Sequence, residues 1–291
     1  MNQRFTVKFF KRVITYTVLG IIAALSVTVI CFGVQISRLN AKLSTSAIYA
    51  ASNQEEAGNQ NQSFDYQSKY PELYVDRTKT TAAKEKKVVY LTFDDGPSSG
   101  YTKRVLNILK KYDVKATFFI VHSNTPGTEK LIQRMIDEGH VIGIHSYTHD
   151  YKKIYASVED YLEDFNKLWI YLRKDFNYEA KIFRFPGGSI NTYNLSTYYK
   201  IIPEMYRRGF TFFDWNTSAE DATIKKLTKE EIINDVLNQV HCNDESIVLM
   251  HDSAEKKTTV SALPEIIKKL KREGYTFKVL DESVRPITFC N

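Results

Sequence analysis

The sequence predicts an α/β fold built on a mainly parallel β-sheet that curves toward a barrel. From residue 87 onward, short apolar runs alternate with amphipathic segments. Repeated strand–helix units are typical of parallel sheets, because a helix returns the chain to the start of the next strand. About seven strands in about 205 residues favour a barrel over an open sheet. Gly139, Gly209 and Gly274 support the element boundaries, because each follows a predicted helix where a positive φ is often required.

The expected elements begin with a buried strand at 88–93, where five of the six residues are β-branched or aromatic. The later strands are short apolar runs at 116–121, 141–144, 181–185, 211–214, 246–250 and 276–279. The helices have apolar residues at helical spacing and cover 101–112, 128–138, 158–176, 195–208, 229–240 and 260–273. Residues 87–291 are therefore predicted to form one folded domain.

The N-terminus predicts a membrane anchor. Residues 1–12 hold four basic side chains and precede an uncharged, mostly apolar run from 13 to 34. As a helix, this run would be about 33 Å long, enough to cross the hydrocarbon core of a bilayer. The basic flank predicts a cytoplasmic tail and places everything after Arg38 outside the cell. A cleavable signal peptide is the competing interpretation, but its apolar core is usually about 7–15 residues and is followed closely by a cleavage site. The prediction is a single-pass protein of the cell membrane with an extracellular C-terminal domain.

Residues 35–86 predict an extracellular stalk between the anchor and the domain. The composition there shifts to Asn, Gln, Ser, Ala, Lys and Glu, and no strong periodicity remains. Near the end of this region, Tyr70, Pro71, Leu73 and Tyr74 are candidates for packing against the domain that follows.

Composition sets the broad class of the protein. The 291-residue chain is 43% hydrophobic and 13% aromatic, which indicates a packed core rather than a disordered chain. The net charge is +6, and without a concentrated basic block it argues against nucleic acid as a partner.

Three cysteines are too few for a disulfide scaffold, and Cys31 lies in the apolar N-terminal run. Cys242 and Cys290 could form a disulfide outside the cell, and free thiols are the equal alternative.

Two adjacent carboxylates end the first predicted strand. Asp94 and Asp95 follow the apolar run, and Gly96 and Pro97 then prevent the strand from continuing. The C-terminal ends of parallel strands are where α/β active sites lie. Like charges held close together repel unless a cation or a shared proton lies between them. A solvated turn is the alternative interpretation of this short motif, so its meaning depends on the other strand ends.

Histidines and aspartates gather at the other predicted strand ends. The chemically active side chains found there are His145, His149, Arg184, Asp214, Asp221, His251 and Asp252. His145 and His149, four residues apart, can place two imidazoles on one cation, although two surface histidines flanking a turn are the alternative. A carboxylate from Asp94 or Asp95 would complete a site of two histidines and one aspartate, with an open position for water. Because thiolates are absent from this set, zinc is the expected metal, with cobalt or nickel as alternatives.

This donor set provides the parts of a hydrolase. A metal in such a site lowers the pKa of water and polarises a carbonyl group. The second aspartate can accept the proton of the attacking water, and a departing amine needs an acid such as His251. The metal and a backbone N–H at Gly187 would stabilise the developing oxyanion, by about 3–4 kcal/mol per donor.

Four successive motifs resemble those of a known family. The motifs are TFDDGP at 92–97, HSYTH at 145–149, RFPGG at 184–188 and LMH at 249–251. In this order, and over about 87–280, they are similar to the motifs of the polysaccharide deacetylases, the NodB-homology enzymes of carbohydrate esterase family 4. The resemblance implies a distorted (β/α) barrel that hydrolyses N-acetyl groups on cell-wall glycans or chitin-like polymers.

The resemblance also implies a role for each carboxylate and histidine of the first two motifs. Asp94 would be the general base, and Arg184 would orient it. Asp95, His145 and His149 would hold the metal.

The remaining motifs imply the acid and the acetyl pocket, and two positions depart from the family. His251 would be the general acid, and Leu249 would line the pocket. Asp221 and Ala222 stand where the family has Asp-Trp, so Asp221 can still orient His251 while the indole is missing. Gly187 follows the proline of the third motif where the family has Tyr, so the backbone N–H remains and the ring is lost. Both changes predict a wider or differently lined groove.

Tyrosines near the predicted mouth of the barrel are candidates for stacking on sugar rings. They are Tyr147, Tyr151, Tyr193, Tyr198 and Tyr199. Packing inside the domain is the equal alternative for most of them.

The sequence thus predicts a membrane-anchored, metal-dependent hydrolase that removes N-acetyl groups from an extracellular glycan. Peptidoglycan N-acetylglucosamine is the favoured substrate, and a chitin-like oligosaccharide is the alternative. Two other interpretations remain. One is an esterase of O-acetyl groups, as on xylan, or another carbon–nitrogen hydrolase on the same fold. The other is a non-catalytic wall-binding protein, which the complete set of carboxylates and histidines disfavours.

Overall fold

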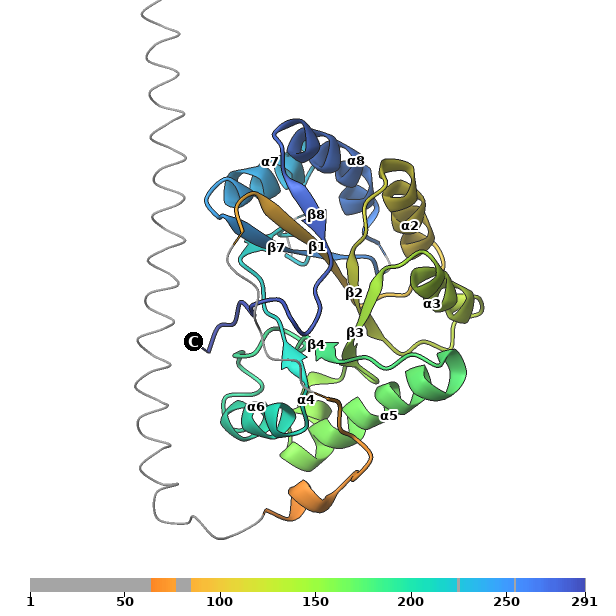
Figure 1. Cartoon of the computed structure of the whole chain (residues 1–291), viewed down its shortest axis with the longest axis vertical. Helices are drawn as coiled ribbons and strands as arrows, with labels where there is room; N and C mark the ends of the chain where they lie inside the picture. The colour runs from red at the N-terminus through yellow and green to blue at the C-terminus, as the bar shows by residue number, and fades with distance from the viewer. Residues whose placement is uncertain (1–63, 77–84, 224–225, 254, 291) are drawn as a thin grey trace, which may run out of the picture. The chain divides into compact units, whose positions relative to one another are not determined.

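The domain is organised on one curled sheet of eight parallel strands, with helices packed around it (Figure 1). The structure is a computed structural model, and it describes residues 64–76, 85–223, 226–253 and 255–290. The strand order is β5-β4-β3-β2-β1-β7-β6, and β8 pairs with β1. The prediction of a mainly parallel α/β sheet is confirmed.

Most of the predicted elements are present. The strands are β1 (Val88–Asp94), β2 (Thr117–Val121), β3 (Val141–Ser146), β4 (Ile182–Phe183), β5 (Thr211–Phe212), β6 (Thr217–Ser218), β7 (Glu245–His251) and β8 (Thr276–Lys278). The helices are η1 (Asp65–Ser68, 3₁₀), α2 (Tyr101–Tyr112), α3 (Thr128–Asp137), α4 (Tyr151–Ile154), α5 (Val158–Phe176), α6 (Tyr198–Arg207), α7 (Lys229–Val240) and α8 (Lys257–Arg272). Strand β6 and the short helices η1 and α4 were not among the predicted elements, and β4 and β5 are shorter than predicted.

The sheet is a half-barrel rather than a closed barrel. Strands β5 and β6 lie at its two ends, and within the described part of the chain they do not pair with each other. Each of them is only two residues long. Next to β6, the side chain of Asn216 takes the place of a ladder residue. Its Oδ1 accepts the N–H of Ile247 at 2.8 Å, and its Nδ2 donates to the carbonyl of Glu245 at 2.8 Å. These bonds fasten the start of β6 to β7.

Strand β1 lies at the centre of the sheet, and all seven of its residues are buried. It pairs with β7 along its whole length, and this register sets Asp94 opposite His251. On its other side, β8 pairs with the first half of β1 and β2 pairs with the second half. Because β1 is buried on both faces, its sequence is a nearly continuous apolar run. Its pairing with β7 also brings the first and last sequence motifs to the same edge of the sheet.

Residues 64–76, within the region predicted as a stalk, pack against the domain. Leu73 and Val75 are buried there. The fully buried guanidinium of Arg208, just after α6, donates hydrogen bonds to four carbonyl oxygens of this segment. Glu204 balances its charge, with 2.6 Å between the Glu204 Oε1 and the Arg208 Nε. The folded unit therefore includes a segment that precedes the predicted boundary at residue 87.

The predicted transmembrane segment, 13–34, lies outside the described residues, as does the predicted tail, 1–12. Within the described ranges, none of the helices combines the length and the apolar composition that a bilayer span requires.

Candidate active site

The three predicted metal ligands lie together at one edge of the sheet. Asp95 directly follows β1, and His145 lies on β3, four residues before His149. One ligand atom of each residue lies within 4.8 Å of the other two. The Oδ1 of Asp95 is 3.1 Å from the Nε2 of His149 and 3.5 Å from the Nε2 of His145. Asp95 and His149 both adopt a positive φ, so turn conformations aim their side chains at one another.

The contacts around this cluster fit a divalent metal. The Nδ1 of His145 lies 2.8 Å from the carbonyl oxygen of Arg184, which can only accept, so Nδ1 carries the proton and Nε2 presents a lone pair. Burial lowers the pKa of His145 and keeps its imidazole neutral. Burial opposes ionisation of Asp95, but His149 and His145 hold the pKa of its carboxyl well below the usual range. The Oδ1 of Asp95 is buried, and it faces the Nε2 atoms of both histidines. A carboxylate oxygen that faces imidazole lone pairs is stable when a cation lies between them, so the donor set suits a metal with nitrogen and oxygen ligands.

A buried aspartate on α5 holds the turn between the two histidines. The Oδ2 of Asp164 accepts the hydroxyl of Ser146 and the N–H of Tyr147, each at 2.7 Å. Its Oδ1 accepts the N–H and the hydroxyl of Thr148 at 2.9 and 2.6 Å. The hydroxyl of Ser146 then accepts the N–H of His149 at 2.8 Å. Sequence reasoning missed Asp164, although an acidic side chain among the buried positions of a helix is a recognisable signal.

Asp94 and Arg184 form a buried ion pair beside the cluster. The Nη1 of Arg184 donates to Asp94 Oδ1 at 2.9 Å and to the hydroxyl of Thr92 at 2.7 Å. Its Nε and Nη2 donate to the carbonyls of Phe213 and Asp214 at 2.9 and 3.1 Å. These four bonds fix the guanidinium and, through it, the carboxylate of Asp94. The second carboxylate oxygen of Asp94, Oδ2, is 3.9 Å from the Nε2 of His145. It therefore faces the cluster of predicted metal ligands.

His251 and Asp221 form a second charge pair at the same edge. The Oδ1 of Asp221 is 2.7 Å from the Nδ1 of His251, and its Oδ2 accepts the backbone N–H of His251 and the hydroxyl of Thr259. Burial lowers the pKa of His251, but the hydrogen bond and the charge of Asp221 outweigh it and raise the pKa overall. The other ring nitrogen, Nε2, lies 4.0 Å from Asp95 Oδ2 and so points toward the cluster. Ala222, at the position of the expected tryptophan, is exposed.

Leu249 lies on β7, two residues before His251, and Gly187 lies in the turn after β4. Leu249 is buried on β7, opposite Thr92 of β1. Gly187 has φ +77°, a conformation that favours glycine. Its N–H makes no hydrogen bond to any residue in the described ranges, so it can donate to a ligand. A Cβ on Gly187 would lie 2.8 Å from a ring carbon of Tyr151, so the missing side chain leaves room for that ring.

Asp252, beside His251, is fully buried and lies outside the predicted site. Its Oδ2 accepts the hydroxyl of Thr102 at 2.5 Å, while its Oδ1 has no hydrogen-bond partner. Burial raises the pKa of Asp252 to about 7. The carboxylate packs against Gly96 so closely that a Cβ there would collide with it. Asp252 therefore supports the loop that follows Asp95.

The candidate tyrosines do not all lie at the site. Tyr151 and Tyr193 lie at the site, because the ring of Tyr151 contacts both His149 and Tyr193 at centroid distances of 5.2 Å. Tyr147 stacks on His122, a residue that sequence reasoning missed, at 4.2 Å. Tyr198 is buried in the core, as the packing alternative predicts.

The described cysteines do not pair with each other. Cys290 carries a free thiol, whose Sγ lies 3.0 Å from the hydroxyl of Ser189. The disulfide between Cys242 and Cys290 is therefore not formed.

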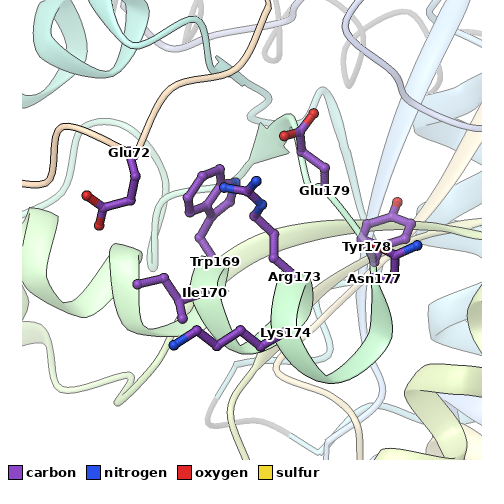
Figure 2. A pocket seen from close by; sticks show the side chains of 8 residues that line it. All are labelled: Glu72, Trp169, Ile170, Arg173, Lys174, Asn177, Tyr178 and Glu179. Atoms are coloured by element: carbon purple, nitrogen blue, oxygen red, sulfur yellow. The ribbon is translucent and has the colours of Figure 1, made fainter.

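A separate hollow of about 720 Å³ lies along the C-terminal part of α5 and the loop after it (Figure 2). It is lined by Glu72, Trp169, Ile170, Arg173, Lys174, Asn177, Tyr178 and Glu179. The guanidinium of Arg173 covers the ring of Trp169 at 4.3 Å, and Trp169 is fully buried. None of the predicted site residues lines this hollow.

Comparison with known proteins agrees with the motifs. Residues 81–201 match the family model described as polysaccharide deacetylase. Over 228 residues, the chain is 33% identical to a peptidoglycan-N-acetylglucosamine deacetylase of Bacillus cereus, covering 76% of this chain and 81% of that protein. It is also 33% identical to a putative polysaccharide deacetylase of Bacillus subtilis over 223 residues, 75% of each chain.

A solved structure shares the fold. The catalytic domain of a peptidoglycan N-acetylglucosamine deacetylase from Eubacterium rectale superposes with a TM-score of 0.68 at 34% identity, covering 72% of this chain and 96% of that domain.

Proposed function

Because this chain belongs to the polysaccharide deacetylase family, we propose that it is a metal-dependent hydrolase that removes N-acetyl groups from peptidoglycan N-acetylglucosamine. One observation carries the proposal. A three-ligand cluster of Asp95, His145 and His149 lies between an Arg-held aspartate on one side and an Asp-held histidine on the other. This is the arrangement that hydrolysis of an amide requires: a ligand site with a base and an acid directed into it.

Each residue of the site has a separate role in the proposed reaction. Asp94 has one oxygen held by Arg184 and the other facing the cluster, so it can take the proton of an attacking water. His251 has a raised pKa and is held by Asp221, so it can deliver a proton to the departing amine. The unpaired N–H of Gly187 can donate to the oxyanion. Leu249 would line the acetyl pocket.

Zinc is the proposed metal, with cobalt or nickel as alternatives, because the donors are two imidazoles and one carboxylate. When bound, the metal supplies Lewis-acid chemistry: it polarises the acetyl carbonyl and acidifies water. Asp95 contributes the anionic donor, and the hydrogen bond from His145 to the Arg184 carbonyl orients the first imidazole.

Chelation is expected to abolish acetate release from purified peptidoglycan, and added zinc or cobalt should restore it. The reason is that the three donor side chains converge on one point, and the metal they would hold supplies the Lewis acid for the reaction. The measurement is acetate release with native enzyme, chelated enzyme and metal-reconstituted enzyme on the same wall preparation. Acetylated xylan serves as the comparison substrate, because faster release from xylan would favour the O-acetyl esterase alternative. Full activity after complete removal of the metal would contradict the proposal.

We also propose that residues 13–34 anchor the protein in the cell membrane and that the deacetylase domain lies outside the cell. The apolar run and its basic flank support this orientation. Protease treatment of intact cells should remove the domain and leave an N-terminal tag protected inside. A soluble, N-terminally cleaved product as the main species would contradict the anchor and favour the signal-peptide interpretation.

A further inference from the structure

The space left by Gly187 is filled from a different part of the chain. Tyr151, on α4, places a ring carbon 2.8 Å and its hydroxyl oxygen 3.3 Å from the point where a Cβ on residue 187 would lie. The same ring packs at right angles on His149, with the centroids 5.2 Å apart. An aromatic side chain therefore lies between the turn at residue 187 and His149.

The hydroxyl of Tyr151 is available to a ligand. It makes no hydrogen bond to any residue in the described part of the chain, and it belongs to a side chain that contacts a proposed metal ligand. A phenol hydroxyl can donate a hydrogen bond to a ligand oxygen.

Tyr193 extends this aromatic surface outward. Its ring lies 5.2 Å from the ring of Tyr151 at an interplanar angle of 56°, and the side chain is 49% exposed. Exposed aromatic rings beside a polar site are suited to stacking on sugars, because a ring face is apolar while the tyrosine hydroxyl stays in water.

The loop that carries Tyr193 is held in place by a hydrogen-bond network. The Nδ2 of Asn191 donates to the carbonyls of Pro186 and Gly188, both at 3.1 Å. The Oδ1 of Asn191 accepts the N–H of Tyr193 at 2.9 Å. The Nδ2 of Asn194 donates to the carbonyl of Ser189 at 3.1 Å. The network ties the loop to the turn at residues 186–189, so the exposure of Tyr193 belongs to a fixed surface.

We propose that Tyr151 and Tyr193 form an aromatic wall that binds an N-acetylated sugar chain beside the catalytic cluster. The hydroxyl of Tyr151 donates a hydrogen bond to the sugar that carries the acetamido group, and the ring of Tyr193 stacks on the neighbouring sugar. This inference rests on the proposed deacetylase function, because it assigns a glycan to the same site.

The test compares a long and a short acetylated substrate. Tyr193→Ala should lower kcat/KM on an N-acetylglucosamine tetramer by about tenfold more than on an aryl acetate, which has no second sugar to stack. That factor corresponds to about 1.4 kcal/mol. Tyr193→Phe keeps the ring and should retain most of the preference for the tetramer over the aryl acetate. Tyr74→Ala removes a comparably exposed tyrosine, 39% exposed, from outside the site and is the matched control.

The tyrosine hydroxyl is tested separately. Tyr151→Phe should raise KM for the tetramer by about three- to tenfold with little change in kcat, as expected for one neutral hydrogen bond to bound substrate. A loss in kcat at constant KM would instead mean that the hydroxyl acts on the reacting atoms, and the wall assignment of Tyr151 would be wrong.

Calorimetric binding of the tetramer to the metal-stripped, full-length protein separates this inference from the proposed function. Weaker binding by Tyr193→Ala supports the wall even where no acetate is released, in which case the deacetylase proposal alone fails. Equal binding by Tyr193→Ala and the parent protein overturns the wall, as does a parent protein that does not bind the tetramer.

Discussion

Asp94→Asn is expected to keep its metal and lose most of its activity. The carboxylate of Asp94 is held by Arg184 and is not one of the three clustered ligands, so a neutral amide there should leave the ligand set intact. Activity should fall by about 10²–10⁴-fold, the usual contribution of a positioned general base. Elemental analysis of metal content and acetate release, both measured on the same preparation, test this expectation.

Asp95→Asn is the matched variant, because it makes the same chemical change one residue along the chain. It replaces the anionic donor of the cluster, so the variant should bind metal weakly. Excess metal should restore part of its activity by mass action on the depleted site, whereas Asp94→Asn should not respond. If Asp94→Asn loses its metal while Asp95→Asn keeps it, the two assignments are reversed. If both variants keep their metal and activity, the proposed mechanism is wrong.

Arg208→Met is expected to destabilise the domain by about 3–5 kcal/mol, the usual cost of removing one partner of a buried ion pair. The guanidinium is fully buried, pairs with the buried Glu204 and satisfies four carbonyl oxygens of residues 64–76. Methionine preserves much of the volume but none of the hydrogen bonds. Urea unfolding of the full-length protein, followed by the fluorescence of its two tryptophans, gives the change in the free energy of unfolding.

Arg207→Met is the control for this change, because Arg207 is the adjacent residue and pairs with the same Glu204. Its side chain is 39% exposed, so its loss should cost about 1 kcal/mol or less. Arg207 also donates to the carbonyl of Gln67 and contacts Tyr74, but from the exposed side of the segment. Equal destabilisation by the two variants would therefore show that burial gives the contacts of Arg208 no added weight.

The candidate site was largely predictable from local patterns. Hydrophobic runs mark strands, and a strand that ends in Asp94 and Asp95 must deliver both to one edge of the sheet. His145 and His149 are brought together by one turn, so their spacing along the chain already indicates a shared ligand. The prediction of Asp221 as the partner of His251 relied on the family motif, and the structure places the two in contact.

The supporting residues were less predictable, because their partners are distant in sequence. Asp164 holds the turn between the histidines from another element, α5, and Asp252 supports the loop after Asp95 from the far end of the chain. Each is one polar residue in an otherwise apolar setting. The sequence marks such a residue as unusual but does not say which backbone groups it satisfies.

The sequence by itself determined the α/β class, the order of the strands along the chain and the pair of histidines in the ligand cluster, because burial periodicity and turn chemistry are local properties. The choice of Asp95 over Asp94 as the third ligand came from the family resemblance. Only the tertiary structure decided three other features. The sheet stays open between β5 and β6, residues 64–76 belong to the folded unit, and the ring of Tyr151 occupies the space at Gly187. The second and third of these depend on contacts between segments far apart in the chain, such as the hydrogen bonds from the Arg208 guanidinium to carbonyl oxygens of residues 64–76. The local residue pattern around one member of such a contact does not identify the other member, because the two segments meet only when the whole chain has folded.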